Sequence, residues 1–440
     1  MNFKKQLEKF IPGGAHTYSR GVDQFPNNSP QILSRGKGCY VYKNKKKFLD
    51  FGMGLRSVGI GYAEDAIDQK VIKAIKNGNN LTLPTFLELK AAKTIVNHFE
   101  NIDMVKFARH GSTVVTSAIK IARSYNRKSY ILRCAEHPFF SLDDWFIGST
   151  KMGRGVPDAI KKFTINFNYS DTEYLKNIIN KNKDISCLIM EASTIKCPLE
   201  ECCGEYPCEK SFKKNYIIDI QNICRENKII FILDEMITGF RWDLKGAQNL
   251  YQITPDISTF GKAIANGYSL SFVGGKRKYM EIGSINKKHN ERSFILSTTH
   301  GSEAVGLSAM LSTLDFYKKH NVVKKNKIFG NELKKLFNKI SSENDLADKI
   351  SMKGLPCSPY ISFTTKGNKQ DMLLKTLFMQ EMLNKNILIP WISICYRHGN
   401  KELDMIANAL VDVFKTIKKT KNIKKKVEGH ILKPVFRKYN

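Results

Sequence analysis

The central part of the chain alternates short, uninterrupted apolar runs with longer amphipathic segments, and this alternation restricts the fold more than any other feature. The runs SYILRC (129–134), SCLIME (186–191) and IIFILDE (229–235) have the length and composition of buried parallel strands. The segment KKNYIIDIQNICRENK (213–228) has the apolar spacing of a helix that connects two such strands. We therefore expect an α/β domain with a mostly parallel sheet.

The two ends of the chain follow a different pattern. Alternating apolar residues around 40–51 predict a β-hairpin. Beyond residue 320, the apolar periodicity predicts helices over 323–342, 371–385 and 401–419, with a strand at 360–365. This mixture is typical of a smaller α+β domain.

These patterns predict how the 440 residues are divided into domains. Residues 1–60 form an N-terminal part of the small domain, residues 61–319 the large domain, and residues 320–440 the C-terminal part of the small domain. Within the large domain, Gly78 should end a first helix, and Thr85 with Glu88 should form the capping box of a second.

Composition excludes several classes of protein. Hydrophobic residues make up 42% of the chain and charged residues 25%, which is ordinary for a globular protein and excludes a wholly disordered or collagen-like chain. No window approaches the roughly 18 uncharged apolar residues that a membrane span needs. The first residues contain neither an apolar signal-peptide core nor a small-residue cleavage site, so we expect a cytoplasmic protein.

The chain is strongly basic, with 71 Lys and Arg against 41 Asp and Glu and a net charge of +30. A charge of this size makes nucleic acid or another anionic surface a partner to consider. The excess is mostly lysine spread along the chain, however, and the densest run, 418–426, has no interleaved aromatic residues. We interpret that run as a solvated helix end and expect no nucleic-acid partner.

Ten cysteines are scattered over the chain, which favours reduced thiols over a disulfide framework. Four of them, Cys197, Cys202, Cys203 and Cys208, lie within twelve residues and could bind zinc. Their spacing contains no CxxC pair, so a surface loop with free thiols is favoured and we expect no metal site.

Two residues that follow expected strands are candidates for a ligand site, because parallel sheets bind ligands at the carboxyl ends of their strands. Asp234 ends the run IIFIL and could pair with a cationic ligand nitrogen, or else serve as a helix cap or a structural ion-pair partner. Lys262 lies between Gly261 and Ala263, where small apolar neighbours would lower its pKa and make it a competent amine for a Schiff base. A surface lysine between two turns is the alternative.

Two further segments could bind an anion. Gly111, Ser112 and Thr113 open an amphipathic helix whose free N–H groups and hydroxyls would suit a phosphate, although an ordinary Ser or Thr N-cap is the alternative. Thr299 lies in a polar turn ahead of a long helix and could also contact a phosphate. The chain has no P-loop and no dinucleotide-binding glycine motif.

An aromatic segment, HPFFSLDDWFIGST (137–150), follows the expected strand at 129–134. One of its rings could stack on a flat cofactor, and core aromatics are the alternative. A lysine, an acid, a phosphate-binding helix start and a stacking aromatic are together what pyridoxal phosphate requires. The acid keeps the pyridine ring protonated, so that the ring can accept electron density when a Cα–H bond breaks.

The segment FILDEMITGFR (231–241), followed by TPDISTFGKAIANG (254–267), resembles the signature of class III (subgroup II) aminotransferases. It most resembles the branch of glutamate-1-semialdehyde 2,1-aminomutase, and the resemblance extends from IPGGAHTYSRG (11–21) to the C-terminal helix. It implies the fold type I of pyridoxal-phosphate-dependent transferases and a homodimer with shared active sites.

The resemblance also implies roles for individual residues. Lys262 matches the Schiff-base lysine of the family, and Asp234 matches the partner of the pyridine nitrogen. Gly111 and Ser112 fall on the glycine and hydroxyl residue that bind the phosphate.

Four more positions fall on residues of the family. Phe139 stands where the family usually has a ring-stacking tyrosine, and Thr299 matches a threonine that reaches the phosphate across the dimer interface. Glu191 falls on the glutamate of a Glu-Pro strand end, and Arg20 lies where the aminomutases have an arginine that holds the substrate carboxylate.

The chain departs from the family pattern at two positions. Thr113 replaces an acidic residue after the phosphate-binding hydroxyl, and Ala192 replaces the proline after Glu191. Neither change affects the expected cofactor. We expect an aminotransferase that moves an amino group from an amino donor to a keto or aldehyde acceptor, such as a sugar or polysaccharide precursor. Glutamate-1-semialdehyde 2,1-aminomutase is the alternative enzyme, and a noncatalytic binding protein with the same fold is the alternative from another class.

Overall fold

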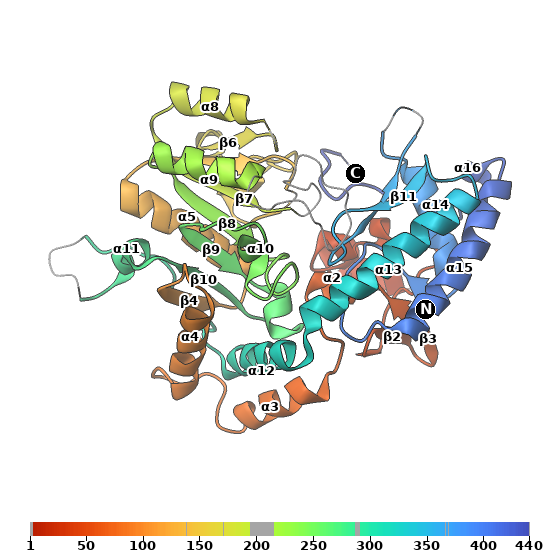
Figure 1. The fold of residues 1–440 in the computed structure, drawn as a ribbon, viewed down its shortest axis with the longest axis horizontal. Helices are drawn as coiled ribbons and strands as arrows, with labels where there is room; N and C mark the ends of the chain where they lie inside the picture. Colours follow the sequence, from red (N-terminus) through yellow and green to blue (C-terminus); the bar gives the residue numbers. More distant parts are fainter. Residues whose placement is uncertain are drawn as a thin grey trace. The chain divides into compact units, whose positions relative to one another are not determined.

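The computed structural model describes residues 3–137, 139–169, 171–193, 215–286, 291–365, 367 and 369–439 (Figure 1). These residues form two compact units. Unit 1 contains the described residues of 3–64 and 324–437, and unit 2 contains those of 65–323 together with Lys438 and Tyr439.

Unit 2 is built on a seven-stranded sheet with the strand order β4-β10-β9-β8-β7-β5-β6. The strands are β4 (Met104–Ala108), β5 (Tyr130–Cys134), β6 (Thr164–Phe167), β7 (Ile185–Glu191), β8 (Ile230–Glu235), β9 (Ile257–Phe260) and β10 (Ser271–Gly275). Strands β5 to β9 pair in parallel, whereas β10 runs antiparallel to both of its neighbours. The predicted α/β fold with a mostly parallel sheet is confirmed, and the three apolar runs are β5, β7 and β8.

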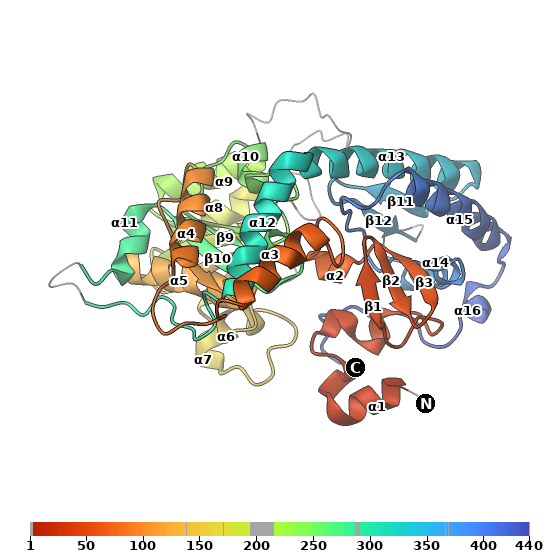
Figure 2. The same cartoon turned by 90° about the horizontal axis from the view of Figure 1, so that it is seen from below.

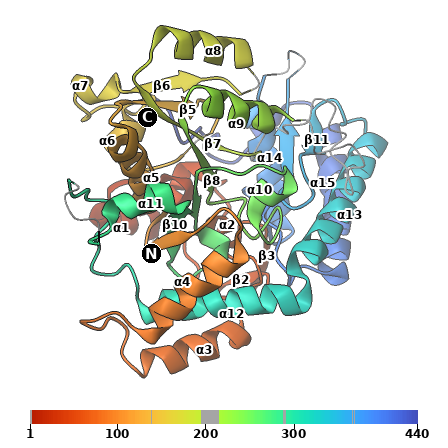
Figure 3. The same cartoon turned by 60° about the vertical axis from the view of Figure 1, so that its left-hand side comes forward.

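The helices of unit 2 pack against this sheet or against one another. They are α3 (Asp65–Ile75), α4 (Phe86–His98), α5 (Gly111–Asn126), α6 (Asp144–Ile147), α7 (Asp158–Lys161), α8 (Thr172–Lys181), α9 (Tyr216–Glu226), α10 (Gly246–Leu250), α11 (Arg277–Met280) and α12 (Ala304–His320). Short 3-10 turns span Lys262–Ala265 and Glu281–Gly283. Helix α5 packs across β4, β7, β9 and β10, while α9 and α10 pack on β8. Figure 3 shows α8 and α9 lying next to one another.

Local sequence signals account for the ends of several helices. The expected capping box is present at the start of α4, where Thr85 accepts a hydrogen bond from the N–H of Glu88 and Glu88 accepts one from the N–H of Thr85. Asn215 caps α9 in the same way, through the N–H groups of the second and third helical residues. Gly78, beyond the end of α3, has a φ of +94°, which favours glycine.

Unit 1 contains two sheets. The first has the order β1-β2-β3-β13, from β1 (Arg35–Lys37), β2 (Tyr40–Lys43), β3 (Lys46–Asp50) and β13 (Ile387–Leu388). Its strands β1, β2 and β3 lie side by side in Figure 2, and the predicted hairpin is the antiparallel pair β2–β3. Strand β13 pairs in parallel with β3, so residues from both ends of the chain share one sheet. The second sheet pairs β11 (Ile350–Lys353) with β12 (Tyr360–Phe363).

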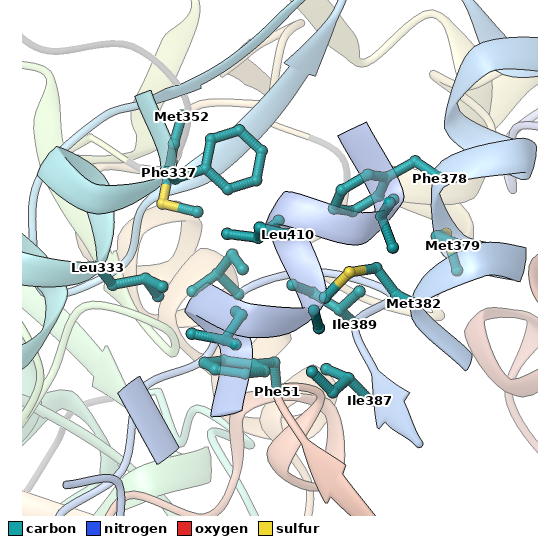
Figure 4. Packing of buried hydrophobic residues seen from close by; sticks show 14 of the residues in the cluster. Phe51, Leu333, Phe337, Met352, Phe378, Met379, Met382, Ile387, Ile389 and Leu410 are labelled. Atoms are coloured by element: carbon teal, nitrogen blue, oxygen red, sulfur yellow. The ribbon is translucent and has the colours of Figure 1, made fainter. Parts of the chain in front are cut away.

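The helices of unit 1 enclose a continuous apolar core. They are α1 (Phe3–Phe10), α2 (Met53–Arg56), α13 (Val322–Glu343), α14 (Met372–Asn384), α15 (Asn400–Lys419) and α16 (Ile423–Lys426), with 3-10 turns at Pro12–Gly14, Tyr18–Arg20 and Val22–Gln24. Phe337, Phe378 and Leu410 meet in the core (Figure 4), and the two phenyl rings pack edge to face with centroids 6.0 Å apart. Burying each such side chain contributes about 1.5–3 kcal/mol. In the part of the chain that the structure describes, no helix is both long and apolar enough to cross a bilayer.

Candidate active site

Asp234 lies near the carboxyl end of β8, and its side chain is almost completely buried, with 1% of the residue exposed. Its Oδ1 accepts hydrogen bonds from the backbone N–H of Met236 at 2.8 Å and from the hydroxyl of Thr259 at 3.4 Å. The parallel pairing of β8 with β9 places Thr259 opposite Asp234. The two strands therefore supply both the carboxylate and one of its donors.

The surroundings of Asp234 have opposing effects on the pKa of its carboxyl group. Burial raises the pKa of Asp234 to about 6, while the N–H of Met236, the positive charge of Lys262 and the hydroxyl of Thr259 all lower it. A carboxylate with this pKa is ionised at neutral pH. It is able to pair with a cationic nitrogen of a ligand, as the pyridine ring of pyridoxal phosphate requires.

Lys262 follows β9 by two residues and begins the 3-10 turn Lys262–Ala265. Its φ is +49°, the left-handed region, which costs a residue with a side chain about 1–2 kcal/mol. Residues Ala263, Ile264 and Ala265 are buried and fix the turn, whereas Lys262 itself is half-buried. Strain of this kind is concentrated at functional sites. Because its charge lowers the pKa of Asp234, Lys262 lies within electrostatic range of that carboxylate.

Two glycines bring the start of α5 and the Lys262 turn to the same place. A Cβ atom added to Gly111 would lie 2.9 Å from Met236 Sδ, and one added to Gly261 would lie 2.6 Å from the same sulfur. Met236 is two residues beyond Asp234. The carboxylate, the lysine turn and the helix start therefore meet around this methionine, and a side chain at either glycine would require its sulfur to move.

The start of α5 is suited to an anion. Its N-cap is His110, whose side chain makes no capping bond, so the alternative of an ordinary Ser or Thr N-cap is wrong. The first N–H groups of a helix have no acceptor within the helix, and its dipole favours negative charge there. Ser112 is buried and its Oγ accepts the N–H of Leu142 at 3.2 Å. Because that bond uses a lone pair of the oxygen, the hydroxyl proton is left to donate to another acceptor.

Phe139 lies in the segment that follows β5. It is 47% exposed, and its ring meets the buried ring of Phe146 edge to face with centroids 5.6 Å apart. Trp145 Nε1 donates to Thr116 Oγ1 on α5 at 2.9 Å, which fastens this segment to the helix. A half-exposed ring can stack on a ligand, whereas Phe140 and Phe146 are core residues.

Glu191 ends β7 next to Asp234, its partner in the parallel register. It is buried, and its N–H donates to Nδ1 of His137 at 3.0 Å. Burial lowers the pKa of His137 to about 3, so the imidazole stays neutral and keeps the lone pair that this bond uses. Sequence reasoning did not identify His137, although its position three residues after the apolar run of β5 was a signal that could have found it.

Glu235 was also not recognised as distinct from its neighbour Asp234. Side chains alternate along a strand, so the two carboxylates point to opposite faces of the sheet. Glu235 is fully buried and accepts hydrogen bonds from the hydroxyl of Thr238 and from the N–H groups of Ala247 at 2.9 Å and Gln248 at 2.8 Å. Burial raises its pKa to about 7. These contacts tie the start of α10 to the end of β8.

The roles expected of Thr299 and Arg20 stay predictions. Thr299 is exposed in a turn ahead of α12. Arg20 belongs to unit 1, where it is exposed and lines a cavity of about 520 Å³ together with Tyr62 and Trp391. The cysteine-rich loop at 197–208 lies outside the described residues.

Comparison with known proteins identifies the family. The family model described as aminotransferase class-III matches residues 22–389. A 3-aminobutyryl-CoA aminotransferase from Cloacimonas acidaminovorans (strain Evry) is 28% identical over 431 residues, which cover 95% of this chain and 97% of that protein. A glutamate-1-semialdehyde 2,1-aminomutase from Wigglesworthia glossinidia brevipalpis is 31% identical over 348 residues, covering 75% of this chain and 76% of that protein.

Solved structures agree with the fold. The FumI protein of Sphingopyxis sp. MTA144, solved in its PLP internal aldimine form, superposes with a TM-score of 0.82 at 18% identity and covers 94% of this chain and 95% of its own. An omega-transaminase from Sphaerobacter thermophilus has a TM-score of 0.79 at 18% identity, with 94% and 96% covered. These similarities confirm the predicted fold type I. Because the family model extends over residues 22–389, the chain belongs to the class-III aminotransferases and is a pyridoxal-phosphate-dependent enzyme.

Proposed function

We propose that this enzyme moves an amino group between an amino donor and a separate keto or aldehyde acceptor, with Lys262 and Asp234 as its catalytic residues. The observation that carries the proposal is the meeting of Asp234, the Lys262 turn and the start of α5 around Met236. Pyridoxal phosphate, when bound, withdraws electron density from the substrate Cα, so that its C–H bond can break.

The two catalytic residues would divide the proton chemistry between them. Asp234 is ionised at neutral pH and would keep a proton on the pyridine nitrogen. The Lys262 amine would hold the cofactor covalently until a substrate amine replaces it. Once released, Lys262 Nζ would take the proton from Cα and return it at C4′.

Other residues would bind and orient the cofactor. The N–H groups of Gly111 and Ser112 at the start of α5, with the hydroxyl of Ser112, would bind the phosphate. The half-exposed ring of Phe139 would stack on the pyridine ring, and buried Glu191 would flank the site beside Asp234. Arg20 would bind a carboxylate of the substrate.

We further propose a homodimer in which each chain completes the other's site. Leu83, Phe86 and Leu89, at the start of α4, are 75%, 92% and 51% exposed. Leu89 also lines a cavity of about 520 Å³ with Thr298 and other residues of the turn that contains Thr299. An exposed apolar surface of this kind is typical of an interface, and in a two-fold dimer the same surface serves both chains. Thr299 would then contact the phosphate of the neighbouring subunit.

Domain roles and location follow the same reasoning. We assign cofactor binding to residues 61–319, with residues 1–60 and 320–440 as the small domain, and the two compact units support this division. Cys39, Cys134, Cys187, Cys224 and Cys395 are buried thiols rather than disulfides, which supports a reducing, cytoplasmic location.

The proposal is tested by screening amino donors against the purified holoenzyme. The panel includes amino acids, amino sugars, 3-aminobutyryl-CoA and glutamate-1-semialdehyde, because two relatives are named for the last two compounds. Conversion of the bound cofactor to pyridoxamine phosphate by one donor, reversed by a separate acceptor, is the expected result. Isomerisation of glutamate-1-semialdehyde without any acceptor would identify the aminomutase instead. No conversion with any donor of the panel would contradict the proposed transfer from these donors, and Lys262→Ala is the inactive control.

A further inference from the structure

The segment that carries Thr299 is held by side chains from two other elements of unit 2. Lys106, on β4, donates from Nζ to the carbonyl oxygen of Leu296 at 2.6 Å. Ser117 Oγ, on α5, lies 3.1 Å from the carbonyl oxygen of Ile295 and 2.9 Å from that of Thr113, so its single proton is shared between these two acceptors. Both bonds are made to backbone atoms, so they fix the path of the chain just before Thr299 whatever the side chains at 295 and 296.

The other end of the same segment is also anchored. Asn79 accepts the N–H of Ala304 with its backbone carbonyl at 2.9 Å and the N–H of Val305 with Oδ1 at 3.1 Å. Its Nδ2 donates to Glu303 at 3.2 Å. The turn that contains Thr299 therefore lies between two fixed points, although Thr299 itself is exposed.

Lys106 is exposed as a residue, but its Nζ is held against the carbonyl oxygen of Leu296. Partial burial of the ammonium group at this contact lowers its pKa. Its partner, the carbonyl of Leu296, is a neutral group and compensates that desolvation only in part. The segment also runs close to β4, because a Cβ added to Gly301 would lie 3.0 Å from the carbonyl oxygen of Phe107. Lys106 thus fastens an exposed turn to the edge of the sheet.

We infer that Lys106 is a positioning residue that acts on the neighbouring subunit. By holding Leu296, Lys106 orients Thr299, which contacts the phosphate in the site of the neighbouring subunit. The inference rests on the shared-site dimer proposed above. Strand β4 is separated from β8 by β10 and β9, which is about 14 Å at the usual strand spacing, so Lys106 does not contact Asp234 of its own chain.

Heterodimers with two different affinity tags can separate an effect on the neighbouring subunit from an effect within the same chain. One chain carries Lys262→Ala, so only the other chain can attach pyridoxal phosphate covalently. Lys106→Met is placed either on the Lys262→Ala chain or on the competent chain. The measurement is the absorbance of lysine-bound cofactor against pyridoxal phosphate concentration, which needs no substrate. We expect the apparent dissociation constant to rise about twofold to tenfold when Lys106→Met is on the Lys262→Ala chain, and to stay unchanged in the other placement.

Control variants keep this inference distinct from the shared-site proposal. Thr299→Val in the same two placements tests the shared site directly. Lys245→Met removes a lysine whose Nζ makes an ion pair with Glu100 at 2.8 Å on the surface, and should change nothing in either placement. Lys106→Arg keeps a donor and should restore part of the affinity. If Lys106→Met does not fold, Ser117→Ala removes the weaker second contact and should show the same dependence on placement with a smaller change.

The outcomes are separable. A loss of affinity only when Lys106→Met is on the competent chain would show that Lys106 acts through its own α5, and an equal loss in both placements would show a general structural role. Either result overturns the inference. If Thr299→Val acts across the dimer and Lys106→Met does not, the inference fails while the shared site stands. If Thr299→Val shows no effect across the dimer, the shared site fails and the inference falls with it.

Discussion

Thr259 on β9 lies opposite Asp234 on β8, and its hydroxyl donates a hydrogen bond to Asp234 Oδ1 across 3.4 Å. The bond joins two neighbouring parallel strands at their carboxyl ends. Together with the N–H of Met236 and the charge of Lys262, it opposes the rise in pKa that burial imposes on Asp234. Asp234 is therefore ionised at neutral pH although its side chain is buried.

Replacing Asp234 by Asn should leave the cofactor bound but reduce the rate of amino transfer by at least about a hundredfold, by analogy with the loss of one preorganised electrostatic group. A carboxylate stabilises the protonated pyridine nitrogen, and an amide does not. The measurement is the single-turnover rate with a donor from the screen, at saturating pyridoxal phosphate. A variant that reacts at a rate near wild type would make Asp234 a structural residue.

Thr259→Val tests the support of that carboxylate. Loss of the hydroxyl should raise the pKa of Asp234 further and slow the reaction by about twofold to tenfold, the range expected for one hydrogen bond. The rate should fall as the pH decreases through the pKa of Asp234, because the carboxylate is then protonated. In the variant this acid limb should lie at higher pH, and an unchanged profile would show that the 3.4 Å contact has no electrostatic effect.

Lys262→Ala should abolish the absorbance of lysine-bound cofactor and the turnover while the fold is retained. The alanine keeps a Cβ at the position whose φ is +49°, so the backbone strain is the same in both proteins. Borohydride reduction of the wild type, followed by peptide mapping, identifies the attached lysine. A pyridoxyl adduct on a different lysine would contradict the assignment, and circular dichroism of the variant checks that it is folded.

Glu235→Gln should change how the stability of the cofactor-free protein depends on pH. Burial raises the pKa of Glu235 from 4.5 to about 7, so the folded state favours the protonated form. Its stabilising contribution is therefore complete below about pH 4.5 and is lost as the pH rises through about 7, a loss on the order of 1–3 kcal/mol. The variant lacks this group, so its free energy of unfolding should fall less over that range than that of the wild type.

Urea unfolding at several pH values measures this difference. Glu100→Gln is the matched control, since Glu100 is exposed and its ion pair with Lys245 keeps its pKa below 4.5. Parallel curves for the wild type and Glu235→Gln would show that Glu235 does not titrate in this range.

Thr299→Val should weaken the binding of pyridoxal phosphate by about tenfold to a hundredfold, the range expected for losing a hydrogen bond of 1.5–3 kcal/mol to a charged group. The dimer itself should persist, because one hydroxyl is small beside an interface of the usual size. Sedimentation measures the assembly, and absorbance titration measures the affinity. A wild-type monomer that binds the cofactor and turns over at full rate would exclude the shared site.

The residues with local signals were found from the sequence. Strand-length apolar runs predicted β5, β7 and β8, since a strand buried on both faces needs apolar residues throughout. Asp234 was found because it ends such a run, and Lys262 was found because it lies among small apolar residues. Their roles stay predictions until the variants are measured, but the structure brings them within electrostatic range of one another.

Other features depend on residues that are far apart in the chain. The bond from Glu191 to His137 and the anchoring of Leu296 by Lys106 have no signature in either segment alone. The same holds for the pairing of β13 with β3, which joins two ends of the chain across more than 300 positions. Short apolar pieces such as β13 carry too little pattern to be assigned before their partner strand is known.

The sequence by itself determined the family, the cofactor and the mostly parallel sheet, because these follow from short motifs and from local apolar periodicity. Only the tertiary structure decided the strand order, the antiparallel direction of β10 and the meeting of Gly111 and Gly261 on Met236. The common physical reason is close packing. Every surrounding element helps to determine which backbone segments can approach one sulfur atom or one buried carboxylate, and no single segment contains that information.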